Sequence, residues 1–316
     1  MSILLEEIQK AGTIAIGGHI RPDGDCIGSC MGLYSYIIEN YPDKRVQVFL
    51  EEIPDAFEYL NRKEALEGNT EKFDLFVSLD CGSPDRLGEA EPIFHVAVRR
   101  VNIDHHISNT NFAEVNHVEA EASSTCEVLC GLLDVEKIDY FSAQAFYTGI
   151  IHDTGVFKHS NTGLSTMEIA GKLMQKGIPY GKIIDESFYM KTYRQLQIMG
   201  RCLLESVRVM DGKVIFSVVS RRVMDFYEAK PSDLDGVIDE MRTTQGVEVA
   251  ILLTEKDTIE YKVSMRSNEF VDVSKIASFF GGGGHIRAAG CTIKGSAFDV
   301  INNITEHIEK QFNDQK

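Results

Sequence analysis

Four short segments of the sequence carry acidic and imidazole side chains of the types that bind metal ions or transfer protons. The first is HIRPDGD, which supplies His19, Asp23 and Asp25 within seven residues. Its proline stiffens the chain and its glycine relaxes it, so that three ligands can point into one space. The alternative is a capped loop, because Asp23 or Asp25 can equally serve as a helix N-cap or a turn residue.

The second and third segments each follow an apolar run that is typical of a buried strand. Asp80 comes directly after FDLFVSL. A carboxylate buried there costs free energy unless it is paired or coordinated, and capping of the turn before Pro84 is the alternative. Asp104, His105 and His106 follow the residues VNI. Adjacent strand residues point to opposite faces, so one histidine as ligand and the other as catalytic neighbour is the more natural division.

The fourth segment is GIIHDT, in which Asp153 ends a helical apolar pattern. A negative charge at that end of a helix opposes the helix dipole, so a positive group is expected beside it. The four segments offer carboxylates and imidazoles but no thiolate, a set that favours Mn²⁺ or Mg²⁺ over structural zinc. Eight candidate side chains exceed the needs of one ion. Two ions about 3.5 to 4 Å apart, sharing one carboxylate, would account for them.

The C-terminal third contains one further segment of interest, FFGGGGHIRAAG. Glycine lets backbone N–H groups approach an anion closely, so Gly283, Gly284 and His285 could hold a phosphate together with the nearby Arg266. A flexible turn is the alternative interpretation. The combination of GGGGH, the small residues AAG and a strand ending in SMRS favours phosphate binding.

The hydropathy pattern predicts a scaffold that brings the four acidic segments together. Short apolar runs alternate with amphipathic stretches over the first two-thirds of the chain, which is typical of a parallel sheet covered by helices on both faces. Ligands of such open sheets bind at the carboxyl ends of the strands. The predicted strands are 13–20, 45–50, 73–80 and 95–106, and the predicted helices are 28–40, 124–134, 142–154, 165–177 and one long helix at 180–204.

The pattern changes near residue 208 and predicts a second, smaller α/β domain. Strands are expected at 214–220, 247–255 and 258–267, and a terminal helix at 297–312. The predicted organisation is a parallel-sheet domain at 1–182, a helical connector at 183–207 and the smaller α/β domain at 208–316.

Charge and cysteine content narrow the class of function. With 48 acidic and 32 basic residues the net charge is −16, so the average field repels long nucleic acid, and a phosphate ligand needs local positive charge. Two divalent cations would supply that charge. The seven cysteines lack the paired spacing of a zinc site, and we expect free thiols in a reducing cytoplasm. We expect neither an export signal nor a membrane span.

The motifs HxxPDGDxxGS at 19–29, LD at 79–80, DHH at 104–106, HD at 152–153 and GGGGH at 281–285 resemble those of the DHH phosphoesterase family with its DHHA1 carboxyl-terminal domain. The resemblance spans nearly the whole chain and is greatest to the nanoRNase branch, short oligoribonucleases that also act on 3′-phosphoadenosine 5′-phosphate. It implies two divalent cations, Mn²⁺ in preference to Mg²⁺. The implied ligands are His19, Asp23 and Asp80 for one ion, and Asp25, Asp80, His105 and Asp153 for the other.

The resemblance also implies roles for residues outside the ligand set. His106 would act on the scissile phosphate as electrophile or proton donor, and Asp104 would orient the histidines. The chain departs from the family pattern at Ile286-Arg287, where a smaller polar pair is expected, and Arg287 is interpreted as an extra phosphate contact. The residues implied to hold the rest of the substrate are Arg266, Gly283, Gly284 and His285.

The implied activity is hydrolysis of short oligonucleotides and dinucleotides to nucleoside 5′-monophosphates, and of 3′-phosphoadenosine 5′-phosphate to adenosine monophosphate, by a water that two metal ions activate. A cyclic or linear dinucleotide phosphodiesterase is the main alternative within the family. A RecJ-like exonuclease and an inorganic pyrophosphatase are disfavoured, the first by the chain length and the second by GGGGH. Outside enzymes of this kind, the sequence leaves open a non-catalytic nucleotide sensor and a protein whose acidic turns are only caps. The expected partners are short oligonucleotides or small phosphonucleotides, with a homodimer left open, and neither long nucleic acid nor membrane.

Overall fold

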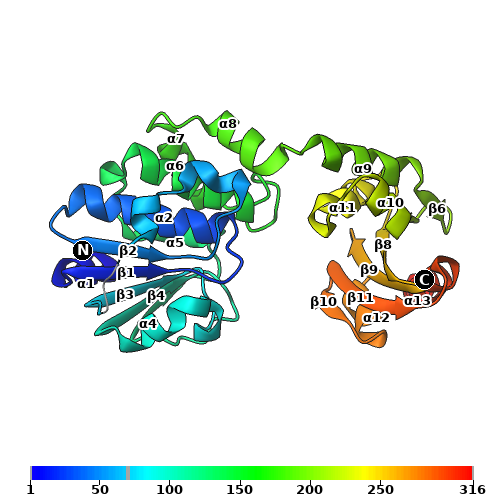
Figure 1. Cartoon of the computed structure of the whole chain (residues 1–316), viewed down its shortest axis with the longest axis horizontal. Coiled ribbons are helices and arrows are strands. Elements are labelled where there is room, and N and C mark those ends of the chain that lie inside the picture. The colour runs from blue at the N-terminus through cyan, green and yellow to red at the C-terminus, as the bar shows by residue number, and fades with distance from the viewer. Residues whose placement is uncertain (1, 69–71, 315–316) are drawn as a thin grey trace. The chain divides into compact units, whose positions relative to one another are not determined.

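The computed structural model describes residues 2–68 and 72–314, which form two compact units, 1–190 and 191–316 (Figure 1). The first unit contains a parallel sheet and the second a mixed sheet. This confirms the predicted fold class, an α/β protein of two domains. The boundary between the units falls within the segment 183–207 that was expected to connect them.

The first unit is built on five parallel strands in the order β2-β1-β3-β4-β5. The chain passes from β1 to β2 on one side and then crosses to β3 on the other side of β1. The connection after β1 and the connection after β3 therefore leave in opposite directions. Such a switch point opens a crevice at the carboxyl ends of the two strands, where ligands of open α/β sheets bind. The strands are β1 (Thr13–Gly17), β2 (Arg45–Phe49), β3 (Leu75–Leu79), β4 (Arg99–Asp104) and β5 (Val115–Val118).

Helices cover both faces of this sheet (Figure 1). Alternating residues of β1 show the two faces: Ile14 and Ile16 join the core beneath α2, α5 and α6, and Ala15 joins the core beneath α4. The helices are α1 (Ile3–Lys10), α2 (Gly24–Asn40), α3 (Lys63–Leu66), α4 (Glu91–Val96), α5 (Thr125–Leu132), α6 (Tyr140–Asp153), α7 (Leu164–Met174) and α8 (Tyr180–Ile184). Shorter turns are the 3₁₀ helices η1 (Asp55–Leu60), η2 (Pro84–Ala90) and η3 (Val135–Lys137), and the π-helical turn η4 (Asp185–Tyr189).

The prediction of one long helix at 180–204 is wrong. Helix α8 passes into η4, the chain then becomes extended at Met190, and a new helix, α9 (Tyr193–Leu204), begins. The Thr192 hydroxyl accepts from the N–H of Gln195, and the Gln195 side chain accepts from the N–H of Thr192. This reciprocal cap is a helix-start signal inside the apparently continuous pattern. The strand expected at 95–106 is likewise shorter, because its first residues belong to α4.

The second unit has a six-stranded sheet in the order β10-β11-β9-β8-β7-β6, in which only β7 and β8 pair in parallel. The glycine-rich segment forms β10 and its successor β11, two strands that were not predicted because neither has a strong alternating apolar pattern. No helix in the described part of the chain is long and apolar enough to cross a bilayer. The elements are β6 (Val207–Val209), β7 (Val214–Val219), α10 (Arg221–Phe226), η5 (Pro231–Leu234), α11 (Val237–Arg242), β8 (Val249–Asp257), β9 (Glu260–Ser267), α12 (Val273–Phe279), β10 (Gly283–His285), β11 (Ala288–Lys294) and α13 (Ala297–Asn313).

Candidate active site

The acidic and imidazole segments of the first unit meet at the carboxyl edge of its sheet. His19 follows β1 and Asp80 directly follows β3, so these two side chains flank the switch point, and Asp104 ends the adjacent strand β4. Asp80 has a left-handed backbone conformation, with φ of 54°. Among residues with a side chain, asparagine and aspartate adopt this conformation most readily.

A first group of ligand-type atoms surrounds His19, which is 5% exposed. Its Nε2 lies 3.4 Å from Asp80 Oδ2 and 3.7 Å from Asp23 Oδ2. The other carboxylate oxygen of Asp23 accepts from two N–H groups at the start of α2, so Asp23 is the N-cap of that helix as well. Burial alone would raise the pKa of Asp23, but the hydrogen bond and the charge of His19 together with the helix N–H groups lower it to about 2.

A second group surrounds His105, at the other oxygen of Asp80. His105 Nε2 lies 3.7 Å from Asp80 Oδ1, 3.9 Å from Asp25 Oδ2 and 3.1 Å from Asp153 Oδ2. The two oxygens of Asp80 therefore face different groups: Oδ2 faces the first and Oδ1 the second. This is the arrangement of a carboxylate that can bridge two cations.

Asp25 is completely buried and is held by the start of α5, a contact that the sequence did not predict. Its Oδ2 accepts from the N–H of Thr125 at 2.6 Å, and its Oδ1 accepts from the N–H of Cys126 at 3.0 Å. The Thr125 hydroxyl donates to Asp80 Oδ1 at 3.1 Å. The positive end of the α5 dipole therefore stabilises Asp25, and the first side chain of the helix orients Asp80.

The start of α5 is itself fixed by the buried carboxylate of Glu127. It accepts from the N–H and the hydroxyl of Ser123 and from the hydroxyls of Ser165 and Thr166 on α7. Ser124 caps α5 by accepting from the N–H of Glu127 at 3.0 Å. The serine followed three residues later by glutamate is a helix-start signature, and the helix predicted at 124–134 begins at this serine.

His106 and Asp104 form a hydrogen-bonded pair beside the second group. His106 Nδ1 donates to Asp104 Oδ1 at 2.8 Å, and Asn109 donates to Asp104 Oδ2 at 2.6 Å. The Asp104 side chain is fully buried, whereas that of His106 is 45% exposed. The hydrogen bond to Asp104 raises the pKa of His106. Asn109 also donates to Asn102, and neither asparagine was predicted to contribute.

The charges of the site favour bound cations. Burial and the neighbouring charges of Asp80 and Asp153 raise the pKa of Asp25 well above its usual value. Burial would lower the pKa of His105, but its hydrogen bond to Asp153 and the nearby acids raise it to about 10. Both shifts show an excess of negative charge that protons offset. Divalent cations would replace those protons. Three groups have donor atoms within 4.8 Å of one another: His19 and Asp80 with Cys26; Asp80, His105 and His106; and Asp25, His105 and Asp153. The predicted ligand Asp23 falls in none of these groups. The carboxylate and imidazole donors are of the kinds that Mn²⁺ and Mg²⁺ take.

One cysteine lies among the donor atoms, which the sequence did not predict. The Sγ atom of Cys26 lies with donor atoms of His19 and Asp80 in one such group. Burial raises the pKa of the Cys26 thiol well above its usual value. All seven cysteines are free and buried, as expected.

The predicted phosphate-binding residues lie together in the sheet of the second unit. Arg266 on β9 pairs with Ala288 on β11, and Ala288 pairs with His285 on β10, so Arg266 and His285 occupy one row of the sheet two strands apart. Gly283 and Gly284 precede His285 on the same edge strand. In this structure Arg266 Nε lies 3.7 Å from Asp239 Oδ1.

The interpretation of Arg287 as a phosphate contact is not supported. Its guanidinium donates to the carbonyl oxygens of Val271, at 3.1 Å, and of Glu269. The buried carboxylate of Glu248 accepts from the N–H groups of Glu269, Phe270 and Val271. Arg287 and Glu248 thus hold the loop that follows β9 from both sides.

Three of the four glycines differ in what a side chain would meet there. A Cβ atom on Gly282 would lie 2.2 Å from the carbonyl oxygen of Gly290, and one on Gly284 would lie 2.5 Å from that of Ala288. Both glycines are therefore needed for β10 to approach β11. A Cβ on Gly283 would meet no atom of the described residues within 4 Å, so this position leaves open space beside the strand.

Comparisons with known proteins agree with this architecture. Residues 13–150 match the DHH family, N-terminal domain, and residues 211–314 match the DHHA1 domain. A bifunctional oligoribonuclease and PAP phosphatase NrnA from Thermus thermophilus is 30% identical, covering 94% of this chain and 89% of the relative. The protein of the same name from Bacillus subtilis is 23% identical, covering 97% and 96%.

Two further matches bear on function and fold. The cyclic-di-AMP phosphodiesterase PdeA of Listeria monocytogenes is 27% identical over 92% of this chain, which covers 46% of that longer protein. The crystal structure of an exopolyphosphatase-related protein from Bacteroides fragilis superposes with a TM-score of 0.82 at 25% identity, covering 97% of this chain and 94% of the other.

Proposed function

Since this chain belongs to the DHH family of phosphoesterases and carries a DHHA1 domain, we propose that it hydrolyses short oligonucleotides to nucleoside 5′-monophosphates and 3′-phosphoadenosine 5′-phosphate to adenosine monophosphate. It is a hydrolase of phosphate esters. The observation that carries the proposal is the position of Asp80, whose two oxygens each face a separate group of carboxylate and imidazole donors.

The proposed site holds two divalent cations, and Mn²⁺ suits its donors best. His19, Asp23 and Asp80 would hold one ion. Asp25, Asp80, His105 and Asp153 would hold the other. When bound, the cations supply Lewis acidity: they lower the pKa of a water toward about 7 and neutralise charge on the phosphate.

The remaining residues act on the substrate. Hydrolysis forms a bond from phosphorus to the oxygen of water and breaks the bond from phosphorus to the leaving oxygen, which must gain a proton. Asp104 holds Nδ1 of His106, so the opposite nitrogen, Nε2, is available to donate that proton. In the second unit Arg266, the backbone at Gly283 and Gly284, and His285 are proposed to bind a phosphate of the substrate.

The size of the substrate follows from charge. A net charge of −16 and the absence of tryptophan are unlike the basic, aromatic grooves of proteins that bind long single strands. Short nucleotides carry few phosphates, which the cations and one arginine can balance. The proposed substrates are therefore dinucleotides, oligonucleotides of a few residues and nucleoside bisphosphates.

The test is a substrate panel with chelator-treated protein to which Mn²⁺ is returned. The panel contains linear diadenylate, cyclic diadenylate, adenosine 3′,5′-bisphosphate and a long oligomer. We expect turnover of the linear dinucleotide and the bisphosphate only with metal, and a loss of more than about a hundredfold in Asp80→Asn, which removes a ligand oxygen. Asp85→Asn, an exposed change on η2, is the matched control. Metal-independent turnover, or full activity of Asp80→Asn, would contradict the proposal.

A second candidate function is hydrolysis of cyclic or linear dinucleotide messengers, which the PdeA relative favours. The same panel decides between them, because this function predicts the highest kcat/KM for cyclic or linear diadenylate and little turnover of the bisphosphate. A protein that bound these ligands with Mn²⁺ but hydrolysed none would be a nucleotide sensor.

A further inference from the structure

Two arginines of the second unit share one carboxylate oxygen. Asp239 Oδ1 lies 3.7 Å from Nε of Arg266 on β9 and 3.9 Å from Nε of Arg242, the last residue of α11. Arg266 belongs to the predicted phosphate-binding residues, whereas Arg242 has no role in the proposed function. Two guanidinium groups therefore meet at one anionic oxygen, which the protein itself supplies.

Helix α11 is anchored beside β9, so Arg242 stays next to Arg266. One side of the helix packs against β7, β8 and β9 through buried side chains (Figure 1). Nη1 of Arg242 donates to Oδ1 of Asn268, which follows β9, at 2.8 Å. The Asn268 side chain donates back to the carbonyl oxygen of Arg242 at 3.0 Å. Arg266 is held on its own strand, where its Nη1 donates to the carbonyl oxygen of Met265 at 3.2 Å.

The Asp239 carboxylate is the least constrained member of this group. Its side chain is 50% exposed, against 30% for Arg242 and 32% for Arg266. Ion pairs that solvent reaches contribute little free energy, so turning this carboxylate toward solvent costs little. A terminal phosphate carries about two negative charges near pH 7, and it therefore interacts with two arginines more strongly than a carboxylate does.

We propose that Arg242 is a second arginine of the phosphate site, and that Asp239 is an internal counter-ion which a terminal phosphate of the substrate displaces from between Arg242 and Arg266. The inference rests on the proposed function and adds to it a residue that the sequence did not single out. Two guanidinium groups match the charge of a terminal phosphate better than the single charge of a phosphodiester. The site is therefore assigned to substrates that carry a terminal phosphate in addition to the group that is hydrolysed.

The first kinetic test removes the charge of Asp239. Asp239→Asn keeps the shape of the side chain, and Glu240→Gln, at an exposed neighbour on α11, is the control. With Mn²⁺ present, we expect Asp239→Asn to lower KM for adenosine 3′,5′-bisphosphate about three- to tenfold and to leave kcat within about twofold, because the phosphate no longer displaces a charged group. An unchanged KM would overturn the proposal. A raised KM would also overturn it, since Asp239 would then serve only to position Arg266.

The second kinetic test removes the charge of Arg242. Two substrates are compared: the bisphosphate, and linear diadenylate without a terminal phosphate. Arg242→Gln should raise KM for the bisphosphate about tenfold and leave KM for the diadenylate within about twofold. Arg222→Gln, an exposed change on α10, is the control and should change neither value. Equal effects of Arg242→Gln on the two substrates, or no effect on either, would contradict the assignment.

A third measurement does not depend on turnover. The Nε–Hε resonances of Arg242 and Arg266 are recorded by NMR while inorganic phosphate is added to metal-free protein. Both resonances should shift together, and at a lower phosphate concentration in Asp239→Asn than in Glu240→Gln. A shift of Arg266 alone, or of neither arginine, would sink the proposal. If both resonances shift but no nucleotide is hydrolysed, the proposed function fails while the phosphate site stands.

Discussion

Replacing Thr125 by valine tests whether the start of α5 organises the proposed metal site. The change removes the hydroxyl that donates to Asp80 Oδ1 and keeps the volume of the side chain. It leaves in place the backbone N–H that donates to Asp25 at 2.6 Å. The perturbation is therefore confined to the orientation of one carboxylate, the one that faces both donor groups.

The magnitude follows from the burial of this contact. Thr125 is 0% and Asp80 2% exposed, so no water replaces the lost donor. A buried hydrogen bond to a charged group contributes about 1.5 to 3 kcal/mol. At about 2 kcal/mol, a unit of this size would lose about 4 to 8 °C in Tm. Without the hydroxyl the Asp80 carboxylate loses one of the contacts that orient it, and metal binding must restore its orientation. We therefore expect the Kd for Mn²⁺ to rise about 10- to 100-fold, as for other residues that hold metal ligands.

The assay is calorimetric titration of chelator-stripped protein with Mn²⁺, with thermal unfolding recorded on the same samples. Thr125→Ser keeps the hydroxyl and is the matched control, so its Kd should stay within about threefold of the native value. The reasoning is refuted if Thr125→Val binds Mn²⁺ as tightly as Thr125→Ser. A lower Tm without weaker metal binding would assign Thr125 a purely structural role.

Three further predictions concern other parts of the chain. Gly283→Ala should fold normally and raise KM for the bisphosphate in a kinetic assay. Gly282→Ala should lower the Tm by several degrees in thermal unfolding. Equal Tm values for the two variants would contradict the packing argument. Hydroxyl and N–H donors lower the pKa of Glu127 below 4.5 although burial opposes them, so its contribution to stability is present above that pH and is lost as the pH falls through the lowered value. The Tm difference between the native protein and Glu127→Gln should accordingly shrink below about pH 4.5, and a constant difference would refute the assignment. Arg287→Ala should speed hydrogen exchange of the loop after β9 and leave KM for the bisphosphate nearly unchanged. A raised KM with unchanged hydrogen exchange would instead support Arg287 as a phosphate contact.

Sequence reasoning located most of the proposed site because its residues follow elements with clear patterns. His19, Asp80 and Asp104 come at the ends of buried strands, and the carboxyl ends of parallel strands meet at one edge of a sheet. Asp153 ends a helix as predicted, and His105 brings positive charge to it. The ligand assignment itself stays a prediction until metal binding is measured.

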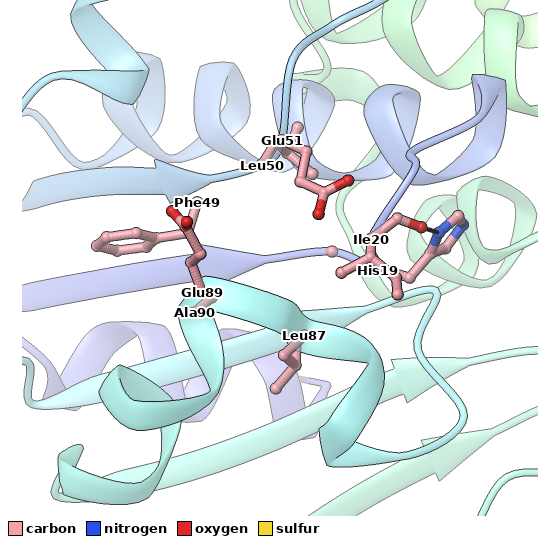
Figure 2. Close-up of a pocket in the computed structure, with 9 residues that line it drawn as sticks. His19, Ile20, Phe49, Leu50, Glu51, Leu87, Glu89 and Ala90 are labelled. Atoms are coloured by element: carbon pink, nitrogen blue, oxygen red, sulfur yellow. Dashed lines mark hydrogen bonds between the residues drawn. The ribbon is translucent and has the colours of Figure 1, made fainter.

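The parts that sequence reasoning missed depend on contacts between distant chain positions. Asp25 and Thr125 are a hundred residues apart, and the donor is a backbone N–H, which any residue type except proline carries. The strands β10 and β11 were missed because glycine, alanine and short polar residues give little alternation; their pairing with β9 defines them. A pocket beside His19 joins three segments with no shared motif, so only their packing shows it (Figure 2).

The left-handed backbone at Asp80 has an evolutionary consequence. Most amino acids that one nucleotide change could introduce there would strain the backbone. Aspartate and asparagine both fit this conformation, but only aspartate carries a charge. Asparagine preserves the conformation and removes the ligand oxygen, and glutamate preserves the charge and strains the chain. Almost every substitution at position 80 therefore costs either charge or backbone strain, and we expect neutral substitutions among related chains to accumulate at other positions.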